Sequence, residues 1–193
     1  MHLESFGGIT ATTTGTGSLQ LGWGEPDWFG PAVPVQPGGP ARVDGGAWVD
    51  EEGSDDLGPW SGAAFESGGV RRWVRAHRDR PVLVLGFEAS EDLAGLATGA
   101  FDRPAVGWTF TPGDRSDGGA PEGMRAVAFQ HCEFALPSQA GSELDGFFLL
   151  PHRPPTGWPL LLSAPDGRTL LVAPLDAFHD QTIGLNGGTL RLG

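Results

Sequence analysis

The chain has 193 residues, of which 39% are apolar and 19% charged, a balance typical of a folded protein with a packed core. Its net charge of −12 disfavours nucleic acid as a partner, because an acidic surface repels a polyanion. No apolar run approaches the ~20 residues of a membrane span and no secretory signal is seen, so we expect a soluble, cytoplasmic protein without a membrane partner. A chain of this length favours a single domain, so we expect residues 1–193 to form one. It is too short for a (β/α)8 barrel, which typically needs about 250 residues.

The first 46 residues predict a hairpin followed by an irregular segment. Residues 7–23 are first rich in Thr and then alternate apolar and polar side chains, which predicts two strands joined by a turn near Gly15–Gly17. Residues 24–46 are dense in Pro and Gly, with Trp28 and Phe29 embedded. We expect no regular element longer than a few residues there.

Charged residues dominate the next segment. We expect residues 50–56 to form a solvated acidic turn, since they lack the carboxylate spacing and the glycine of an EF-hand calcium loop. Residues 70–90 predict a second hairpin, with its turn at Asp79–Arg80. The arginines between 71 and 80 alternate with apolar residues, which predicts an exposed strand face; a phosphate-binding surface is the alternative.

The C-terminal half predicts further strands and little helix. Residues 90–101 are compatible with a short helix capped by Ser90 and weakened by glycines, and residues 124–136 alternate as one strand. Pro165–Gly167 has the residues of a hairpin turn, because proline fixes φ, aspartate tolerates a turn and glycine supplies a positive φ. Asn186–Gly188 predicts another such turn.

Many short strands between Gly and Pro turns predict an all-β protein, an antiparallel β-sandwich with little helix, with a closed barrel as the alternative. Several strands are apolar at consecutive positions, so both of their faces need cover. We therefore expect one outer face to pack against a second domain, another subunit or a third layer, and the chain to be part of a longer protein. The two-sided apolar runs are residues 82–85, 147–150, 160–162 and 170–173.

One polar cluster follows the last of these runs. Asp176, His179 and Asp180 share a face if they lie on a helical turn, where a carboxylate beside an imidazole is a general acid/base pair or half of a metal site. The same residues suit the polar exit of a strand, with Asp176 capping the turn. We expect the strand exit and assign no catalytic residue, but keep all three as candidate ligand-binding residues.

A second cluster, His131, Cys132 and Glu133, has the composition of a metal site. Consecutive side chains on a strand point to opposite faces, so His131 and Cys132 cannot grip one ion. We expect a buried cysteine beside a surface His–Glu pair, no metal and no cofactor.

Seven tryptophans accompany a complete lack of tyrosine. Four aromatic residues lie in or beside Gly/Pro-rich stretches, where indole rings often stack on sugars, and packing against the rest of a larger protein is the alternative. The remaining strand-like tryptophans, Trp73, Trp108 and Trp158, are expected in the core. The candidate sugar-contacting residues are Trp23, Trp28, Phe29 and Trp60.

The C-terminal half carries a resemblance in "RPAVGWTFTPGDR", "EFALP", "FFLLPHRPP", "GWPLLL" and "APDGRTLLVAPLDAFHDQ". It resembles the N-terminal β-sandwich module of bacterial glycoside hydrolases of the α-galactosidase and raffinose-synthase type. The resemblance implies a β-supersandwich like that of galactose mutarotases, followed by a catalytic (β/α)8 barrel as the partner. The family's catalytic aspartates belong to that barrel, so none is carried onto this chain.

The sequence therefore predicts a non-catalytic β-sandwich domain of a carbohydrate-active enzyme, a scaffold that contacts carbohydrate. Two alternatives stay open. One is a stand-alone mutarotase-type enzyme that uses His179 with Asp176 or Asp180 as acid and base. The other is a structural protein whose two-sided apolar strands are buried in an oligomer.

Overall fold

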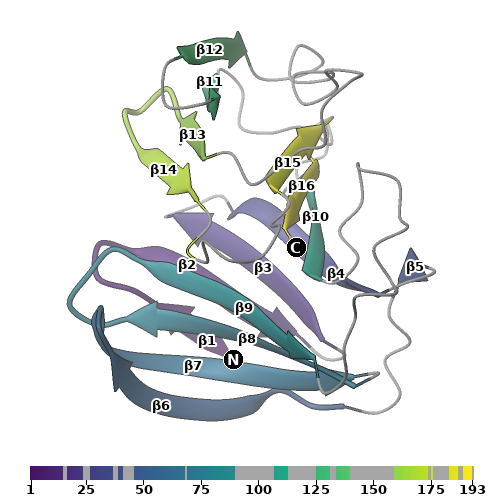
Figure 1. Ribbon diagram of the computed structural model, residues 1–193. Coiled ribbons are helices and arrows are strands. Elements are labelled where there is room, and N and C mark those ends of the chain that lie inside the picture. Colours follow the sequence, from purple (N-terminus) through teal and green to yellow (C-terminus); the bar gives the residue numbers. More distant parts are fainter. Residues whose placement is uncertain are drawn as a thin grey trace.

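A computed structural model describes residues 1–14, 17–23, 27–36, 39–40, 46–67, 69–89, 107–112, 125–130, 134–139, 159–173, 175, 183–186 and 189–192. The described part of the chain is all β, with every strand pair antiparallel, as the sequence predicts (Figure 1). No helix long and apolar enough to cross a membrane occurs in these residues.

The large sheet contains eight of the described strands, in the order β1-β2-β3-β4-β10-β16-β15, with β5 paired to β4. It combines the N-terminal strands with three strands from the C-terminal half. Their bounds are β1 (His2–Glu4), β2 (Ile9–Thr14), β3 (Ser18–Trp23), β4 (Asp27–Gln36), β5 (Gly39–Pro40), β10 (Gly107–Pro112), β15 (Ile183–Asn186) and β16 (Thr189–Leu192).

Two smaller sheets complete the described architecture, each with four strands. The β6–β9 sheet is a meander, in which each strand pairs with the next along the chain. Its strands are β6 (Val49–Asp55), β7 (Gly58–Ser67), β8 (Val70–His77) and β9 (Leu83–Ala89). The β11–β14 sheet has the order β12-β11-β13-β14 and contains β11 (Arg125–Gln130), β12 (Phe134–Gln139), β13 (Leu160–Ser163) and β14 (Thr169–Val172).

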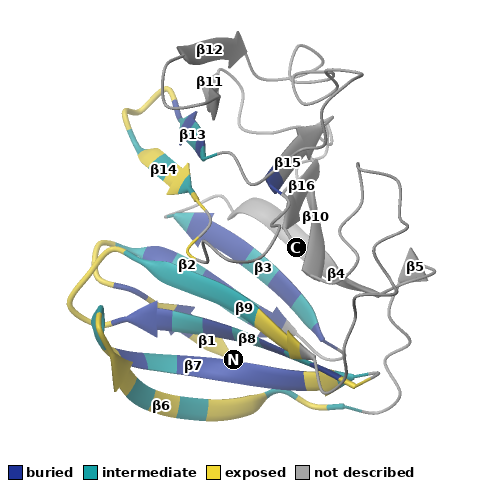
Figure 2. Ribbon diagram, in the orientation of Figure 1, coloured by how far each residue is buried: buried dark blue, intermediate teal, exposed yellow. Residues whose placement is uncertain are grey.

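The large sheet and the β6–β9 sheet lie face to face as a sandwich. Figure 1 shows β1 and β2 lying against β8 and β9, and the Phe6 amide donates to the carbonyl of His77 across the layers at 3.0 Å. The buried core cluster has members from all three sheets, and Figure 2 colours the buried positions dark blue. Its buried members are Leu3, Ala11, Leu19, Leu21, Ala63, Val74, Ala76, Leu160, Leu162, Ala164 and Ile183.

The tight turns form where the sequence predicts them. Thr14 pairs with Ser18 around the first turn, where Gly17 has a φ of 78°, and Asn186 pairs with Thr189 at the last one. The β8–β9 hairpin closes with Ala76 opposite Leu83. These turns are local features of the chain, which is why residue type alone locates them.

The turn at Pro165–Gly167 is reinforced by its own aspartate. Asp166 accepts the backbone N–H of Arg168 at 3.1 Å and its Nε–H at 2.7 Å, and Gly167 has a φ of 89°. These hydrogen bonds, above all the one from the Arg168 side chain, lower the pKa of Asp166 below its ordinary 3.8.

Asp166→Asn is expected to lower the unfolding midpoint at neutral pH, because it removes the charged hydrogen bond at this turn. A lowered pKa in the folded state means that the carboxylate stabilises the fold above the unfolded-state pKa of 3.8 and loses this effect as the pH falls through the folded-state pKa. Thermal unfolding of both proteins, from about pH 7 down to the onset of acid unfolding, should show a difference that narrows at low pH. A difference that stays constant with pH would reject the ion pair as its cause.

Three predicted segments are wrong. Residues 24–46 contain the ten-residue strand β4, which pairs with β3 and β10. Its register shifts between Phe29 and Ala32 on both sides, so Pro31 lies in an irregularity that tolerates a missing N–H donor. The acidic residues 50–55 lie in strand β6 rather than in a turn. They suit the sheet edge, where exposed charge discourages further pairing.

The third correction concerns residues 124–136, which form a hairpin rather than one strand. Arg125 pairs with Gln139 and Gln130 with Phe134, so the chain reverses in between. Alternation continues through a tight reversal and cannot reveal it. The residues of the predicted helix at 90–101 and of the His131–Glu133 cluster lie outside the described residues.

The two-sided apolar runs differ in how they are buried. Leu160 and Leu162 are fully buried and Leu161 is half-buried, whereas Leu171 on β14 is 57% exposed. Residues 82–85 are half-buried throughout, and 147–150 lie outside the described residues. An outer apolar surface therefore remains at β14, where the sequence predicts that a partner covers it.

Candidate functional site

The candidate residues from the sequence fall into different sheets. Trp23 ends β3 in the large sheet, where its indole N–H donates to the carbonyl of Gly7 at 2.8 Å, and Trp60 lies in β7 and is buried. Trp28 and Phe29 belong to the backbone of β4, and their side chains are outside the described set. The structure does not bring Trp23 and Trp60 together. Asp176, His179 and Asp180 lie outside the described residues.

The most chemically varied surface is the outer face of the β6–β9 sheet, the face turned away from the core. Alternation along β8 places one set of its side chains in the core and the other on this outer face. Cross-strand pairing then sets the neighbours, with His77 opposite Trp60 and Trp73 opposite Gly86. The charged, histidine and tryptophan side chains of this face are Glu51 and Asp55 of β6, Trp60 and Glu66 of β7, Arg71, Trp73, Arg75 and His77 of β8, and Glu88 of β9.

An arginine between two tryptophans, here called the Trp60–Arg75–Trp73 stack, occupies the middle of this face. The guanidinium carbon of Arg75 lies 4.3 Å from the ring centroid of Trp60 and 4.0 Å from that of Trp73. Both distances are within the range of cation–π attraction. The stack holds the guanidinium in place, since a group packed on two rigid rings has few alternative rotamers.

Glycines on the neighbouring strands make room for the indole rings. A Cβ atom at Gly53 would lie 2.6 Å from Trp60, and one at Gly86 would lie 2.1 Å from Trp73. Both distances are far below van der Waals contact, so any larger residue would displace a ring. Glycine inside a strand often marks close approach of another group, and here that group is an indole.

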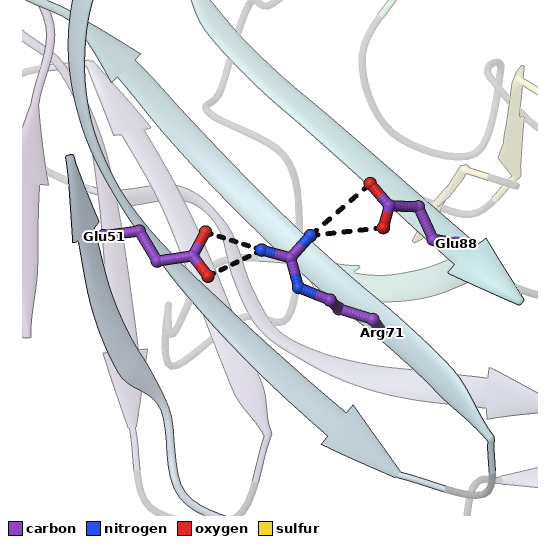
Figure 3. A network of polar contacts seen from close by, with 3 residues as sticks. All are labelled: Glu51, Arg71 and Glu88. Atoms are coloured by element: carbon purple, nitrogen blue, oxygen red, sulfur yellow. Dashed lines mark hydrogen bonds and ion pairs between the residues drawn. The ribbon is translucent and has the colours of Figure 1, made fainter. Parts of the chain in front are cut away.

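A charged network lies beside the stack (Figure 3). Arg71 donates two hydrogen bonds to Glu51, at 2.6 and 2.7 Å, and two longer ones to Glu88 at 3.4 Å. The hydrogen bonding with Glu51 raises the pKa of Arg71 above its ordinary value. The network ties β6, β8 and β9 together on the outer face, and its single cation is already shared by two carboxylates.

Asp55 and His77 form the other end of the face. An Asp55 carboxylate oxygen lies 3.7 Å from His77 Nε2 and 3.9 Å from Arg75 Nη1, both too long for hydrogen bonds. The imidazole of His77 is fully buried, and neither ring nitrogen has a hydrogen-bond partner in the described part of the chain. Buried polar atoms without partners are uncommon, so this end of the face holds unused hydrogen-bonding capacity.

Arg75 also has unused hydrogen-bonding capacity. Its Nε is buried without a hydrogen-bond partner, and its one ion-pair contact among the described residues is the 3.9 Å approach to Asp55. The side chain nevertheless keeps 24% of its surface accessible. The accessible part of this guanidinium can offer N–H donors to a ligand at the surface.

Sequence reasoning missed this site because it assigned the strand faces differently. Trp73, expected in the core, is half-buried on the outer face, and Trp60, expected in a loop, is buried in a strand. Arg72, expected on an exposed face, is fully buried, and burial lowers its pKa. The missed signal was the set of strand glycines that face Trp60 and Trp73.

The outer face combines aromatic surface, guanidinium donors and carboxylate acceptors. It suits reversible binding of a polyhydroxylated ligand, because hydroxyl groups need both donors and acceptors. No group of three or more His, Cys, Asp or Glu side chains suited to a metal ion occurs in the part that the structure describes. Comparisons with protein-family models, with curated proteins and with solved structures found no match to the chain.

Proposed function

We propose that this chain is a non-catalytic β-sandwich domain of a carbohydrate-active enzyme, and that it contacts sugar through the outer face of the β6–β9 sheet. The observation that carries the proposal is the Trp60–Arg75–Trp73 stack, in which the Arg75 side chain keeps 24% of its surface accessible. Trp73 replaces the loop tryptophans as the proposed stacking surface, because it is half-buried on the outer face, whereas Trp60 is 8% exposed.

The chemistry of the face supports a sugar over other ligands. The Trp73 indole offers apolar surface for the C–H face of a pyranose ring, and Arg75 donates hydrogen bonds to ring substituents. Asp55 and Glu88, with 34% and 61% of their side chains exposed, accept hydrogen bonds from hydroxyls. A nucleic acid would meet a chain of net charge −12, which disfavours its approach.

The scaffold part of the proposal is supported by the outer apolar residues near β14. Leu171 and Leu175 are 57% and 70% exposed, the kind of surface that another domain covers. A catalytic barrel domain or another subunit is the proposed partner.

Trp73→Ala is expected to abolish glycan binding, because it removes the surface on which the sugar stacks and one of the two rings of the Trp60–Arg75–Trp73 stack. A sugar stacks on the flat face of an aromatic ring, and loss of the ring removes that contact entirely. The measurement is a glycan array, followed by calorimetric titration of the best neutral and acidic sugars, with the full 193-residue chain.

The matched control is Trp48→Phe. Trp48 packs against the core and lies 5.6 Å from the Phe65 ring, on the side away from the stack, so this variant should bind as the parent does. Equal binding by Trp73→Ala and the parent would reject the outer face as the site. A parent chain that binds no glycan on the array would reject carbohydrate contact itself.

A further inference from the structure

We propose that Arg75 anchors the carboxylate of an acidic sugar, so that the outer face of the β6–β9 sheet selects uronic acids over their neutral counterparts. This inference rests on the proposed function and names the class of sugar. It follows from the observation that Arg75 has no hydrogen-bonded carboxylate partner in the described part of the chain.

The arginines in the described residues differ in how their charge is balanced. Arg71, Arg78 and Arg168 each have a carboxylate oxygen within 2.6 to 2.8 Å, from Glu51, Glu52 and Asp166 respectively. At that distance the charge-assisted hydrogen bond is fully formed. The charge of each of these three arginines is therefore already balanced by a hydrogen-bonded carboxylate.

Arg75 has no such partner in the described part of the chain. Its closest carboxylate oxygen, on Asp55, is at 3.9 Å, and its Nε is buried without an acceptor. Three quarters of its side-chain surface is nevertheless removed from water, since 24% remains accessible. A cation that has lost much of its hydration and gained no hydrogen-bonded anion is stabilised by a ligand that supplies one.

The two indole rings hold the guanidinium in an orientation suited to binding a carboxylate. With ring centroids at 4.3 and 4.0 Å from its central carbon, the planar group is held before any ligand arrives. Its paired N–H donors match the two oxygens of a carboxylate, and little side-chain entropy is lost on binding. A carboxylate attached to a pyranose would place the sugar ring against the neighbouring indole surface.

The overall acidity of the chain does not prevent this contact. The net charge of −12 is spread over the whole surface, and physiological salt screens charges beyond about 8 Å. Glu51 and Glu88, two of the other carboxylates on this face, both bind Arg71, which balances part of their charge. A single carboxylate at Arg75 meets this cation with Asp55 beside it, whereas a highly charged polyanion would also meet the other acidic residues of the face.

The test compares trigalacturonate with its methyl ester, which differ in charge and hardly in shape. We expect the full chain to bind the acid about tenfold more tightly than the ester, the gain from one charge-assisted pair of hydrogen bonds. Arg75→Gln should remove the preference, so that it binds the acid and the ester with affinities within about twofold of each other. Arg78→Gln, which deletes a cation paired to Glu52, should retain the preference in full.

Arg75→Lys keeps the positive charge but removes the planar guanidinium that is held between the two indole rings. It should recover only part of the preference, because an ammonium group cannot form the bidentate pair or stack between two rings. Full recovery would overturn the proposed role of the stack. Thermal unfolding of each variant would establish that it is folded before binding is compared.

The outcomes separate this inference from the proposed function. Binding of neutral sugars with no preference for the acid would overturn the role of Arg75 and leave carbohydrate contact standing. No binding of any sugar, acidic or neutral, would reject both. A hexaglutamate peptide that binds as tightly as trigalacturonate, with the same dependence on Arg75, would overturn the assignment to sugar and indicate an acidic peptide instead.

Discussion

Phe65→Ala is expected to lower the free energy of unfolding by about 3–5 kcal/mol, the usual cost of truncating a buried phenylalanine. Phe65 lies in β7 with 1% of its surface exposed, and its ring packs against Trp48 with centroids 5.6 Å apart. A cavity at this position would leave ring-sized space in the core between the two layers. Urea unfolding followed by tryptophan fluorescence provides the measurement.

The control is the same substitution at the surface. Phe6 is 62% exposed, so Phe6→Ala should change the free energy of unfolding by no more than about 0.5 kcal/mol. Similar effects at the two positions would contradict the placement of the Phe65 side chain inside the sandwich.

Gly17→Ala is expected to destabilise the protein by about 2–4 kcal/mol, from backbone strain and a steric clash together. Gly17 has a φ of 78°, a conformation that alanine adopts only with strain, and an added Cβ would lie 2.7 Å from the Phe65 ring. The ring is buried and cannot move aside without disturbing the core. Urea unfolding of the variant at neutral pH tests this expectation.

Gly167→Ala separates the two causes. Gly167 has a similar φ of 89°, but a Cβ there would meet nothing within 4 Å, so only the strain of about 1 kcal/mol applies. We expect Gly17→Ala to cost clearly more than Gly167→Ala. An equal loss of stability in the two variants would mean that a Cβ atom at position 17 does not clash with the Phe65 ring.

Local features of the fold could be predicted from the sequence, and long-range ones could not. The turns at Gly17, Asp79–Arg80 and Pro165–Gly167 depend on a few neighbouring residues, and each lies where those residues predict it. Strand β4 was missed because its prolines read as loop residues, whereas its pairing with β3 and β10 joins distant parts of the chain. Such pairing overrides local propensity.

The candidate site was missed for a related reason. Both faces of β8 mix arginine with apolar residues, so alternation alone cannot say that Arg72 is buried and Arg75 is at the surface. The neighbouring strands decide it, since Gly53 and Gly86 leave room for indole rings on one face only. That information appears once the register of the four strands is known.

The predicted polar exit at Asp176, His179 and Asp180 illustrates the same limit. Its chemistry depends on whether three nearby residues share a turn, and these residues lie outside the described part of the chain. The outer face of the β6–β9 sheet offers a better defined target for mutation, because the distances between its side chains are known.

Two-dimensional ¹H–¹⁵N NMR of the full chain, titrated with trigalacturonate, tests the central claim most directly. The side-chain Nε–H of Arg75 and the indole N–H of Trp73 report on the two groups proposed to contact the sugar, and Nε of Arg75 has no other hydrogen-bond partner among the described residues. We predict saturable shifts of these two signals and of backbone amides on β6–β9. Shifts confined to the large sheet, or unchanged signals from Arg75 and Trp73, would contradict the proposed sugar site.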